Sequence, residues 1–147
     1  MRNDSNKRTD VVSVVIPSFN EAESLNTLCD EIVSVLASLP NEYEIIFVND
    51  GSRDGSQKML ESIVEKNPSG VVKAIELKRN FGKAVALSVG FANAKGDIIV
   101  TMDADLQDDP SEIPRFIEKI NEGYDVVSGW KTDRKDSFIK NTTSKIY

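Results

Sequence analysis

Asp103 and Asp105, two aspartates two residues apart, are the sharpest candidates for chemistry in this sequence. They follow an apolar run at 97–101 that predicts a buried strand, so both carboxylates are expected where that strand ends. Such a pair can place one carboxylate on a divalent cation and the other on a ribose or a second ligand position, because hard cations take oxygen ligands and often share them with substrate phosphates. Gln107 is either a further metal ligand or a turn residue, and a solvated turn is the alternative for the pair itself.

Polar side chains also follow the other predicted strands, at 17–21, at Asp50 and at 78–83. In an open parallel sheet, ligands bind beyond the carboxyl ends of the strands, where the strand order reverses. Asp50 is expected to accept hydrogen bonds from a base or a ribose hydroxyl. Lys83 could meet phosphate or sugar oxygens, or be solvated. Glu21 lies at a predicted helix N-terminus, where an acidic residue is favoured without any ligand.

The elements that must position these residues alternate along the chain. Apolar, β-branched runs predict strands at 11–16, 44–49, 71–77, 97–101 and 124–128. Helical spacing of apolar residues predicts helices at 21–38, 54–67, 84–94 and 112–121. Together they predict an α/β fold with a doubly wound, mostly parallel sheet, related to the Rossmann fold and covered by helices on both faces.

Composition excludes several classes of chemistry. The chain has 147 residues, 39% of them hydrophobic and 29% charged, which is typical of one soluble globular domain. It has no His, which excludes a Ser-His-Asp triad, His-ligated zinc and a histidine pH switch. The single Cys29 allows no internal disulfide, fits a reducing compartment, and falls on the apolar side of a predicted helix, where we expect it to pack in the core.

The charge balance limits the partners. A formal net charge of −6 disfavours nonspecific nucleic-acid binding and would repel an anionic substrate unless a cation screens it. No signal peptide is evident, and no apolar run approaches the roughly 18 residues that span a bilayer. We therefore expect a cytoplasmic chain.

The chain divides near Trp130, after which the periodic pattern stops. We expect a flexible N-terminus at 1–10, a folded core at 11–130, and at 131–147 the start of a further region that is cut short. This last segment carries five basic and two acidic residues, so it could meet an anionic membrane surface or be an ordinary solvated tail.

Two common nucleotide motifs are missing. No Gly-x-Gly-x-x-Gly follows the first predicted strand, and no Gly-Lys-Ser/Thr loop is present. A dinucleotide-binding Rossmann domain and a P-loop NTPase are thereby disfavoured. A nucleotide bound here would have to be held by carboxylates and a metal.

Four segments resemble the inverting, nucleotide-sugar-dependent glycosyltransferases of family 2, which have the GT-A fold. They are Val14-Val15-Ile16-Pro17-Ser18-Phe19-Asn20-Glu21, Val48-Asn49-Asp50-Gly51-Ser52-Arg53-Asp54-Gly55-Ser56, Arg79-Asn80-Phe81-Gly82-Lys83, and Asp103-Ala104-Asp105-Leu106-Gln107-Asp108-Asp109-Pro110. The last two look most like the branch that uses undecaprenyl or dolichyl phosphate as acceptor. One departure is mild, because Asn49 stands where many members have an acidic residue.

The resemblance implies that 11–130 is a nucleotide-sugar-binding core and that 131–147 is the start of an acceptor or membrane-proximal region. It also implies a role for each matching residue. The nucleoside would be contacted by Pro17, Phe19, Glu21, Asp50 and Asp103. A Mg or Mn ion at the diphosphate would be held by Asp105 with Gln107. Substrate would be bound by Lys83 and by Arg134, which falls where this branch places a basic residue near the acceptor phosphate. The catalytic set would be Asp103, Asp105 and Arg134.

The function that the resemblance implies is metal-assisted, inverting transfer of a sugar from a UDP- or GDP-sugar to a polyprenyl phosphate or a saccharide, as in cell-envelope polysaccharide synthesis, at the cytoplasmic face of a membrane. A lipid phosphate is already an anionic nucleophile, so a site without His suffices, whereas a saccharide acceptor normally needs a further carboxylate as base.

Two other classes compete with this function. A non-catalytic nucleotide-sugar-binding module would bind nucleotide with metal and never release free nucleotide. A phosphoacceptor receiver domain needs an acidic pair after the first strand and a Lys after the fifth. Here Pro17-Ser18 follows the first predicted strand and Gly129-Trp130 follows the fifth. The sequence leaves the sugar, the base and the oligomeric state open.

Overall fold

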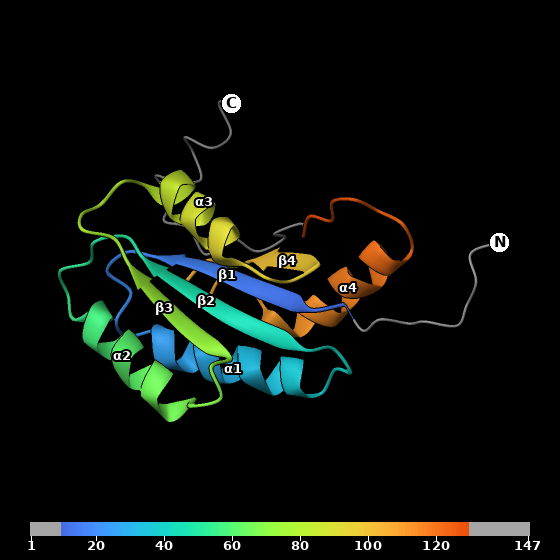
Figure 1. The fold of residues 1–147 in the computed structure, drawn as a ribbon, viewed down its shortest axis with the longest axis horizontal. Helices are drawn as coiled ribbons and strands as arrows, with labels where there is room; N and C mark the ends of the chain where they lie inside the picture. Colours follow the sequence, from blue (N-terminus) through green and yellow to red (C-terminus); the bar gives the residue numbers. More distant parts are fainter. Residues whose placement is uncertain (1–9, 130–147) are drawn as a thin grey trace.

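The computed structural model describes residues 10–129, which form a parallel sheet between two layers of helices (Figure 1). Its elements, in chain order, are β1 (Val12–Ser18), α1 (Leu25–Ala37), β2 (Tyr43–Asn49), α2 (Ser56–Lys66), β3 (Val72–Glu76), α3 (Lys83–Asn93), β4 (Ile98–Thr101), the short 3-10 helix η1 (Pro110–Glu112) and α4 (Ile113–Asn121). The expectations for 1–9 and 130–147, Arg134 included, lie outside the described residues.

The sheet has the strand order β3-β2-β1-β4, and every pairing in it is parallel. The chain first adds β2 and β3 on one side of β1 and then crosses to place β4 on the other side. The strand order therefore reverses between β1 and β4, which is where an open α/β sheet forms its ligand crevice.

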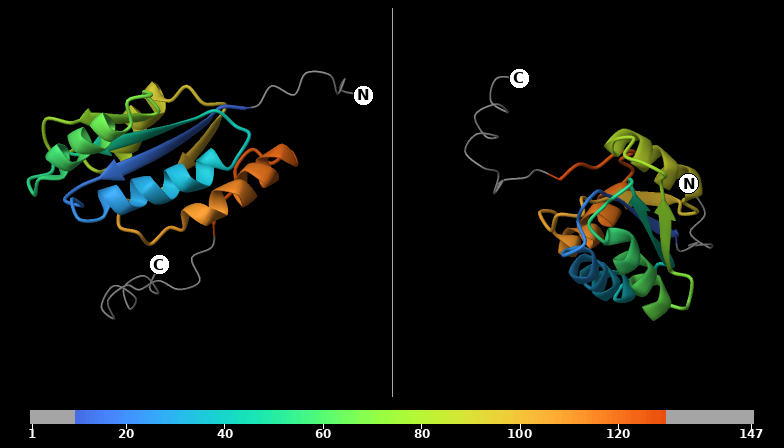
Figure 2. Two further views of the ribbon diagram at one scale, coloured as in Figure 1. Left: turned by 90° about the horizontal axis from the view of Figure 1, so that it is seen from below. Right: turned by 90° about the vertical axis from the view of Figure 1, so that its left-hand side faces the viewer.

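Helices cover both faces of the sheet, as the sequence predicts. In Figure 1, α1, α2 and α4 lie on one face and α3 on the other, and Figure 2 shows α1 and α4 on the side of the sheet away from α3. Side chains alternate along β1, so Val12, Val14 and Ile16 pack into the larger core with α1, α2 and α4. The core under α3 is smaller and contains Ile46, Val48 and Ala86.

Close approach of α3 to the sheet depends on Gly90. A Cβ added at this position would lie 2.3 Å from the Cγ1 atom of Val15 on β1. A larger residue would lift the helix, whose first residue is Lys83. The close packing of Gly90 thus helps to set the position of Lys83 relative to the ends of the strands.

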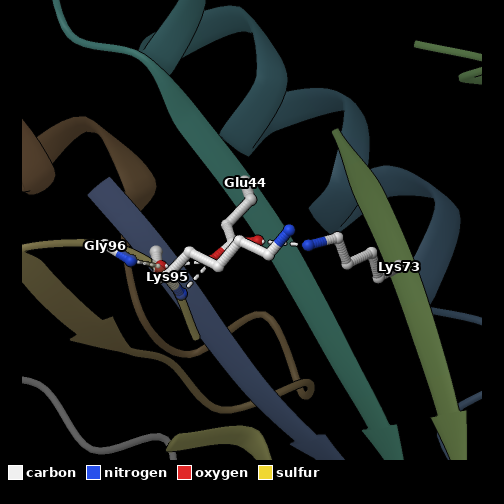
Figure 3. A network of polar contacts seen from close by, with 5 residues as sticks. Glu44, Lys73, Lys95 and Gly96 are labelled. Atoms are coloured by element: carbon white, nitrogen blue, oxygen red, sulfur yellow. Dashed lines mark hydrogen bonds and ion pairs between the residues drawn. The ribbon is translucent and has the colours of Figure 1, made fainter. Parts of the chain in front are cut away.

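A polar network ties the opposite end of the sheet together (Figure 3). The buried Glu44 of β2 accepts hydrogen bonds from the Ser13 hydroxyl at 2.6 Å and the Lys95 backbone N–H at 2.6 Å, and it forms an ion pair with Lys73. The Gly96 N–H donates to the Ser13 hydroxyl at 2.8 Å. Burial opposes ionisation of Glu44, but the hydrogen bonds outweigh it and lower the pKa of this carboxyl. The network fixes the α3–β4 connection to the sheet.

The prediction of a fifth strand at 124–128 is wrong. These residues take no strand conformation, and Tyr124 and Val126 are 59% and 84% exposed. A strand needs a neighbour to complete its backbone hydrogen bonds, and within residues 10–129 this segment pairs with none of β1 to β4. The short apolar run resembles a strand in pattern but finds no ladder to join.

The predicted helix at 21–38 begins four residues late, at Leu25. Residues 22–24 form a turn instead, because their polar groups bond to other loops. Among the described residues, no helix is both long and apolar enough to span a membrane.

Candidate functional site

A cleft of about 320 Å³ opens at the carboxyl ends of β1, β2 and β4. It lies at the reversal of strand order between β1 and β4. The residues that line it are Pro17, Ser18, Phe19, Glu21, Asp50, Asn80, Gly82, Lys83, Asp103, Ala104 and Asp105. The structure thus brings together every predicted site residue in its described part except Gln107, which is exposed and does not line the cleft.

Four carboxylates and one lysine line this cleft. Burial raises the pKa of Glu21, and the negative charges of Asp105, Asp54 and Asp103 raise it further, against a lowering hydrogen bond from Ser24. The carboxylates therefore share one electrostatic field although they come from distant segments. An anionic ligand would enter this field only with a cation that offsets it.

Asp50 is 3% exposed and lies at the end of β2. Its Oδ1 atom accepts from the Phe81 N–H at 2.8 Å and its Oδ2 atom from the Gly82 N–H at 2.9 Å. Asp50 therefore holds the loop before α3 in place. Each carboxylate oxygen keeps further acceptor capacity for a ligand, because a carboxylate offers about four lone-pair sites.

Gly51 lets the same loop pack directly on the turn after β2. It has a φ of 71°, and a Cβ added there would lie 2.3 Å from the carbonyl carbon of Arg79. Only glycine combines this backbone conformation with such close approach. The Arg79 guanidinium in turn lies 4.8 Å from the centre of the Phe81 ring.

Lys83, at the start of α3, forms an ion pair with Asp103 beyond the end of β4. The Lys83 side chain is 60% exposed and that of Asp103 33% exposed. The backbone N–H of Asp103 donates to the Asp108 carboxylate at 2.8 Å. The lysine thus reaches the aspartate pair from the opposite side of the cleft.

Asp105 lies in a tight turn at the cleft mouth. Its Oδ1 atom accepts the Gln107 N–H at 3.1 Å, and the intervening Leu106 has a φ of 62°. The Gln107 backbone therefore has the turn role that the sequence left open, while a metal role for its side chain stays a prediction.

The oxygen ligands that the cleft offers are of the type that a hard divalent cation prefers. Asp103 and Asp105 offer carboxylate oxygens to the same cleft, and Mg²⁺ or Mn²⁺ prefers such ligands. Within residues 10–129, no group of three or more His, Cys, Asp or Glu side chains could hold a metal by itself. A cation here would draw its remaining ligands from substrate phosphates and water.

Sequence reasoning missed the residues that join the loops. Asn20, at a φ of 54°, donates its N–H to the Ser52 hydroxyl and accepts from the Arg53 N–H, both at 2.9 Å. Asp54 accepts from the Ala22 N–H at 3.1 Å. An Asn or Asp just after a strand could have indicated such a loop contact, because both side chains form hydrogen bonds readily with nearby backbone groups.

A family model described as glycosyl transferase family 2 matches residues 13–146. The chain belongs to this family. Similar relatives are named undecaprenyl-phosphate 4-deoxy-4-formamido-L-arabinose transferase. The one from Proteus mirabilis (strain HI4320) is 47% identical over 135 residues, and the one from Klebsiella pneumoniae (strain 342) is 46% identical over 135 residues. Both alignments cover 92% of this chain and 41% of the relative. The resemblance to the polyprenyl-phosphate branch is confirmed, and the chain spans about two fifths of these relatives.

Solved structures confirm the predicted fold. The mannosyltransferase PcManGT from Pyrobaculum calidifontis, in complex with GDP-Man and Mn²⁺, is 28% identical with a TM-score of 0.62, over 67% of this chain and 28% of that one. GalNAc-T7 with UDP, GalNAc and Mn²⁺ is 30% identical with a TM-score of 0.55, over 67% and 19%. Mannosyl-3-phosphoglycerate synthase from Rubrobacter xylanophilus, 22% identical with a TM-score of 0.62 over 78% and 37%, shows the fold alone.

Proposed function

We propose that residues 11–130 form the donor-binding part of an inverting, metal-assisted glycosyltransferase that takes a sugar from a UDP- or GDP-sugar. One observation carries this proposal: Asp50, from the loop after β2, lines a single cleft with Asp103 and Asp105, from the loop after β4, at the reversal of strand order. The names of the similar relatives support a polyprenyl phosphate as acceptor. The complexes of two similar structures with a nucleotide or nucleotide sugar and Mn²⁺ support the donor class.

The nucleoside would lie against the inner wall of the cleft. Asp50 is the buried carboxylate of that wall and could accept hydrogen bonds from a base or ribose. Pro17, at the end of β1, lines the cleft with Phe19 and Glu21 from the loop that follows. Phe19 is 44% exposed, and its ring could stack on a base. Asp103 would complete this set from β4.

Asp105, with Gln107, would hold the divalent cation at the donor diphosphate. Asp105 suits this role because it lies at the cleft mouth and is exposed. When bound, such a cation stabilises the negative charge that develops on the leaving diphosphate. It would also offset the charge of the four cleft carboxylates, which a diphosphate could not approach unaided.

The transfer itself would need little acid–base chemistry. An oxygen of the acceptor phosphate forms a bond to the anomeric carbon of the sugar while the bond from that carbon to the diphosphate oxygen breaks, which inverts the configuration. The nucleophile is already anionic, so the chain positions the reactants and supplies no general base. Lys83 would bind phosphate or sugar oxygens beside Asp103, and Arg134 would meet the acceptor phosphate.

The acceptor side of the proposal places the chain at the cytoplasmic face of a membrane, with the basic segment 131–147 toward the anionic surface. The alternative is a module that binds a nucleotide sugar without transfer. Release of free nucleotide from the donor in the presence of Mn²⁺ separates the two, because only the enzyme breaks the sugar–phosphate bond.

A thermal-shift panel of UDP, GDP, CDP and NAD, each with and without Mn²⁺, tests the donor class. We expect one nucleoside diphosphate to stabilise the chain in the presence of Mn²⁺, by about 2.7 kcal/mol at a hundredfold excess over its Kd. Asp105→Asn should abolish the metal-dependent part, and the exposed Asp125→Asn should not. Stabilisation by none of the four ligands would overturn the proposal.

A further inference from the structure

Ser24 occupies the N-cap position of α1 but does not cap the helix. A serine at this position usually accepts a hydrogen bond from a backbone N–H of the first turn. Here no side-chain cap hydrogen bond forms, and the residue has a helical φ of −93° and ψ of −24°. Its hydroxyl is therefore available for another role.

The Ser24 hydroxyl donates instead to the carbonyl oxygen of Ala104, a residue 80 positions further along the chain. Ser24 is 9% exposed and Ala104 4% exposed, so this hydrogen bond is shielded from water. The carbonyl of Glu21 is a second acceptor at 3.0 Å. The hydroxyl has one proton to share among these two carbonyls and the Glu21 carboxylate, whose pKa its hydrogen bond lowers. It lies where the loop after β1 meets the turn after β4.

Ala104 separates Asp103, which is assigned to the nucleoside, from Asp105, which is assigned to the cation. Fixing its carbonyl orients the peptide plane between Ala104 and Asp105, which contains the Cα atom of Asp105 and so helps to set where the Asp105 side chain leaves the backbone. The hydrogen bond that the Asp103 N–H donates to the Asp108 carboxylate and the one that the Gln107 N–H donates to Asp105 close the turn on itself. The Ser24 bond differs from these because it ties the turn to a helix.

We propose that Ser24 is a positioning residue, whose hydroxyl holds the Asp103–Asp105 turn in the orientation that receives the metal-bound diphosphate. This inference rests on the proposed function. It assigns to Ser24 no contact with the donor. Residues that orient metal ligands act on affinity through geometry, and their loss typically costs about 10- to 100-fold in metal affinity or activity.

The test compares calorimetric titrations of the nucleoside diphosphate that binds the unaltered chain, with and without Mn²⁺. Ser24→Ala should weaken binding in Mn²⁺ by about tenfold and leave binding without Mn²⁺ within about twofold of the unaltered chain. Ser24→Thr, which keeps the hydroxyl, should regain most of the lost affinity. Ser38→Ala is the matched control, since Ser38 ends the same helix and donates to the Val35 carbonyl on an exposed surface.

Equal affinities of Ser24→Ala and the unaltered chain in Mn²⁺ would overturn the inference. An equal loss with and without Mn²⁺ would also overturn it, because that is the result of a general structural role. If Ser24→Ala does not fold, amide hydrogen exchange of the unaltered chain tests whether Ser24 is coupled to the Asp103–Asp105 turn. Binding of Mn²⁺ and nucleotide should slow exchange at 24–28 as well as at 103–108, and unchanged exchange at 24–28 would contradict the coupling.

The outcomes separate this inference from the proposed function. An unaltered chain that binds no nucleoside diphosphate in Mn²⁺ overturns both. An unaltered chain that binds one, together with a Ser24→Ala chain that binds it equally well, overturns the role of Ser24 alone.

Discussion

Lys83 forms an ion pair with Asp103 across the mouth of the cleft, so the structure already places a cation on one of the two aspartates. The lysine ammonium and a divalent ion would compete for the same negative field. A diphosphate, in contrast, would be attracted by both. Removing the lysine charge is therefore expected to change the affinities for the divalent ion and for the diphosphate in opposite directions.

Lys83→Met is expected to bind Mn²⁺ alone about threefold more tightly and a nucleoside diphosphate about threefold more weakly. These factors correspond to the range of up to about 1 kcal/mol for a partly exposed ion pair. Titration of Mn²⁺ followed by its electron paramagnetic resonance, and calorimetry of the nucleotide, measure the two effects. Lys58→Met, an exposed residue of α2, is the control. A parallel change of both affinities would contradict the competition.

Asp50→Ala is expected to weaken nucleotide binding even without metal. It removes the acceptor of the Phe81 and Gly82 N–H groups and so loosens the loop that leads to Lys83. Loss of these hydrogen bonds should also lower the free energy of unfolding by about 1–3 kcal/mol. Calorimetry in the absence of Mn²⁺ and urea denaturation measure the two effects. Nucleotide affinity equal to that of the unaltered chain would exclude a ligand-binding role for Asp50.

Gly51→Ala is expected to destabilise the fold by about 2 kcal/mol or more, because it adds a close contact with the Arg79 backbone to the cost of a positive φ. Gly70→Ala is the matched control. Gly70 has a φ of 74°, close to that of Gly51, but a Cβ there meets nothing within 4 Å. The difference between the two variants in urea denaturation therefore isolates the contact. Equal losses of stability in the two variants would show that the loop at Arg79 moves away from the added Cβ atom at no cost.

Glu44→Gln is expected to lower the free energy of unfolding at pH 7 by about 1–3 kcal/mol, because the buried Glu44 loses its charge toward Lys73 and the Lys95 N–H. The pKa of Glu44 is lowered in the folded chain. The stability that its charge contributes is therefore present above the ordinary pKa of 4.5 and is lost as the pH falls through the folded value.

Chemical denaturation at pH 7 and near pH 3.5 checks this dependence on Glu44. The gap between Glu44→Gln and the unaltered chain should narrow at the lower pH. Glu42→Gln, at an exposed position two residues away, should show no comparable gap at either pH. A gap of the same size at both pH values would mean that the charge of Glu44 contributes nothing.

Much of the fold could be predicted from the sequence, because strong patterns specify it. The strands β1 and β2 are short, apolar and mostly buried, β3 and β4 are shorter runs with β-branched residues, and α1, α2 and α4 show apolar residues at helical spacing. Asp50, Asp103 and Asp105 were placed at one edge by the rule that parallel strands end together. The segment 124–128 failed because an apolar run does not reveal whether a neighbouring strand exists.

The interior of the site was less predictable. That Asp50 would bond the Phe81 and Gly82 N–H groups depends on two loops meeting in space, and no local pattern encodes it. No local pattern indicates the hydrogen bond of Ser24 either, since its partner Ala104 lies 80 residues away. Sequence spacing predicts which strand end a residue follows, whereas the partner of its side chain is decided by tertiary packing.

The most direct test is a crystal structure of the chain grown with Mn²⁺ and the nucleoside diphosphate that stabilises it, with the metal located by anomalous scattering. We predict an anomalous peak in the cleft, in direct contact with the Asp105 carboxylate and the diphosphate, and a nucleoside beside Asp50. A nucleotide bound outside the cleft, or a metal peak with no contact to Asp103 or Asp105, would contradict the central claim.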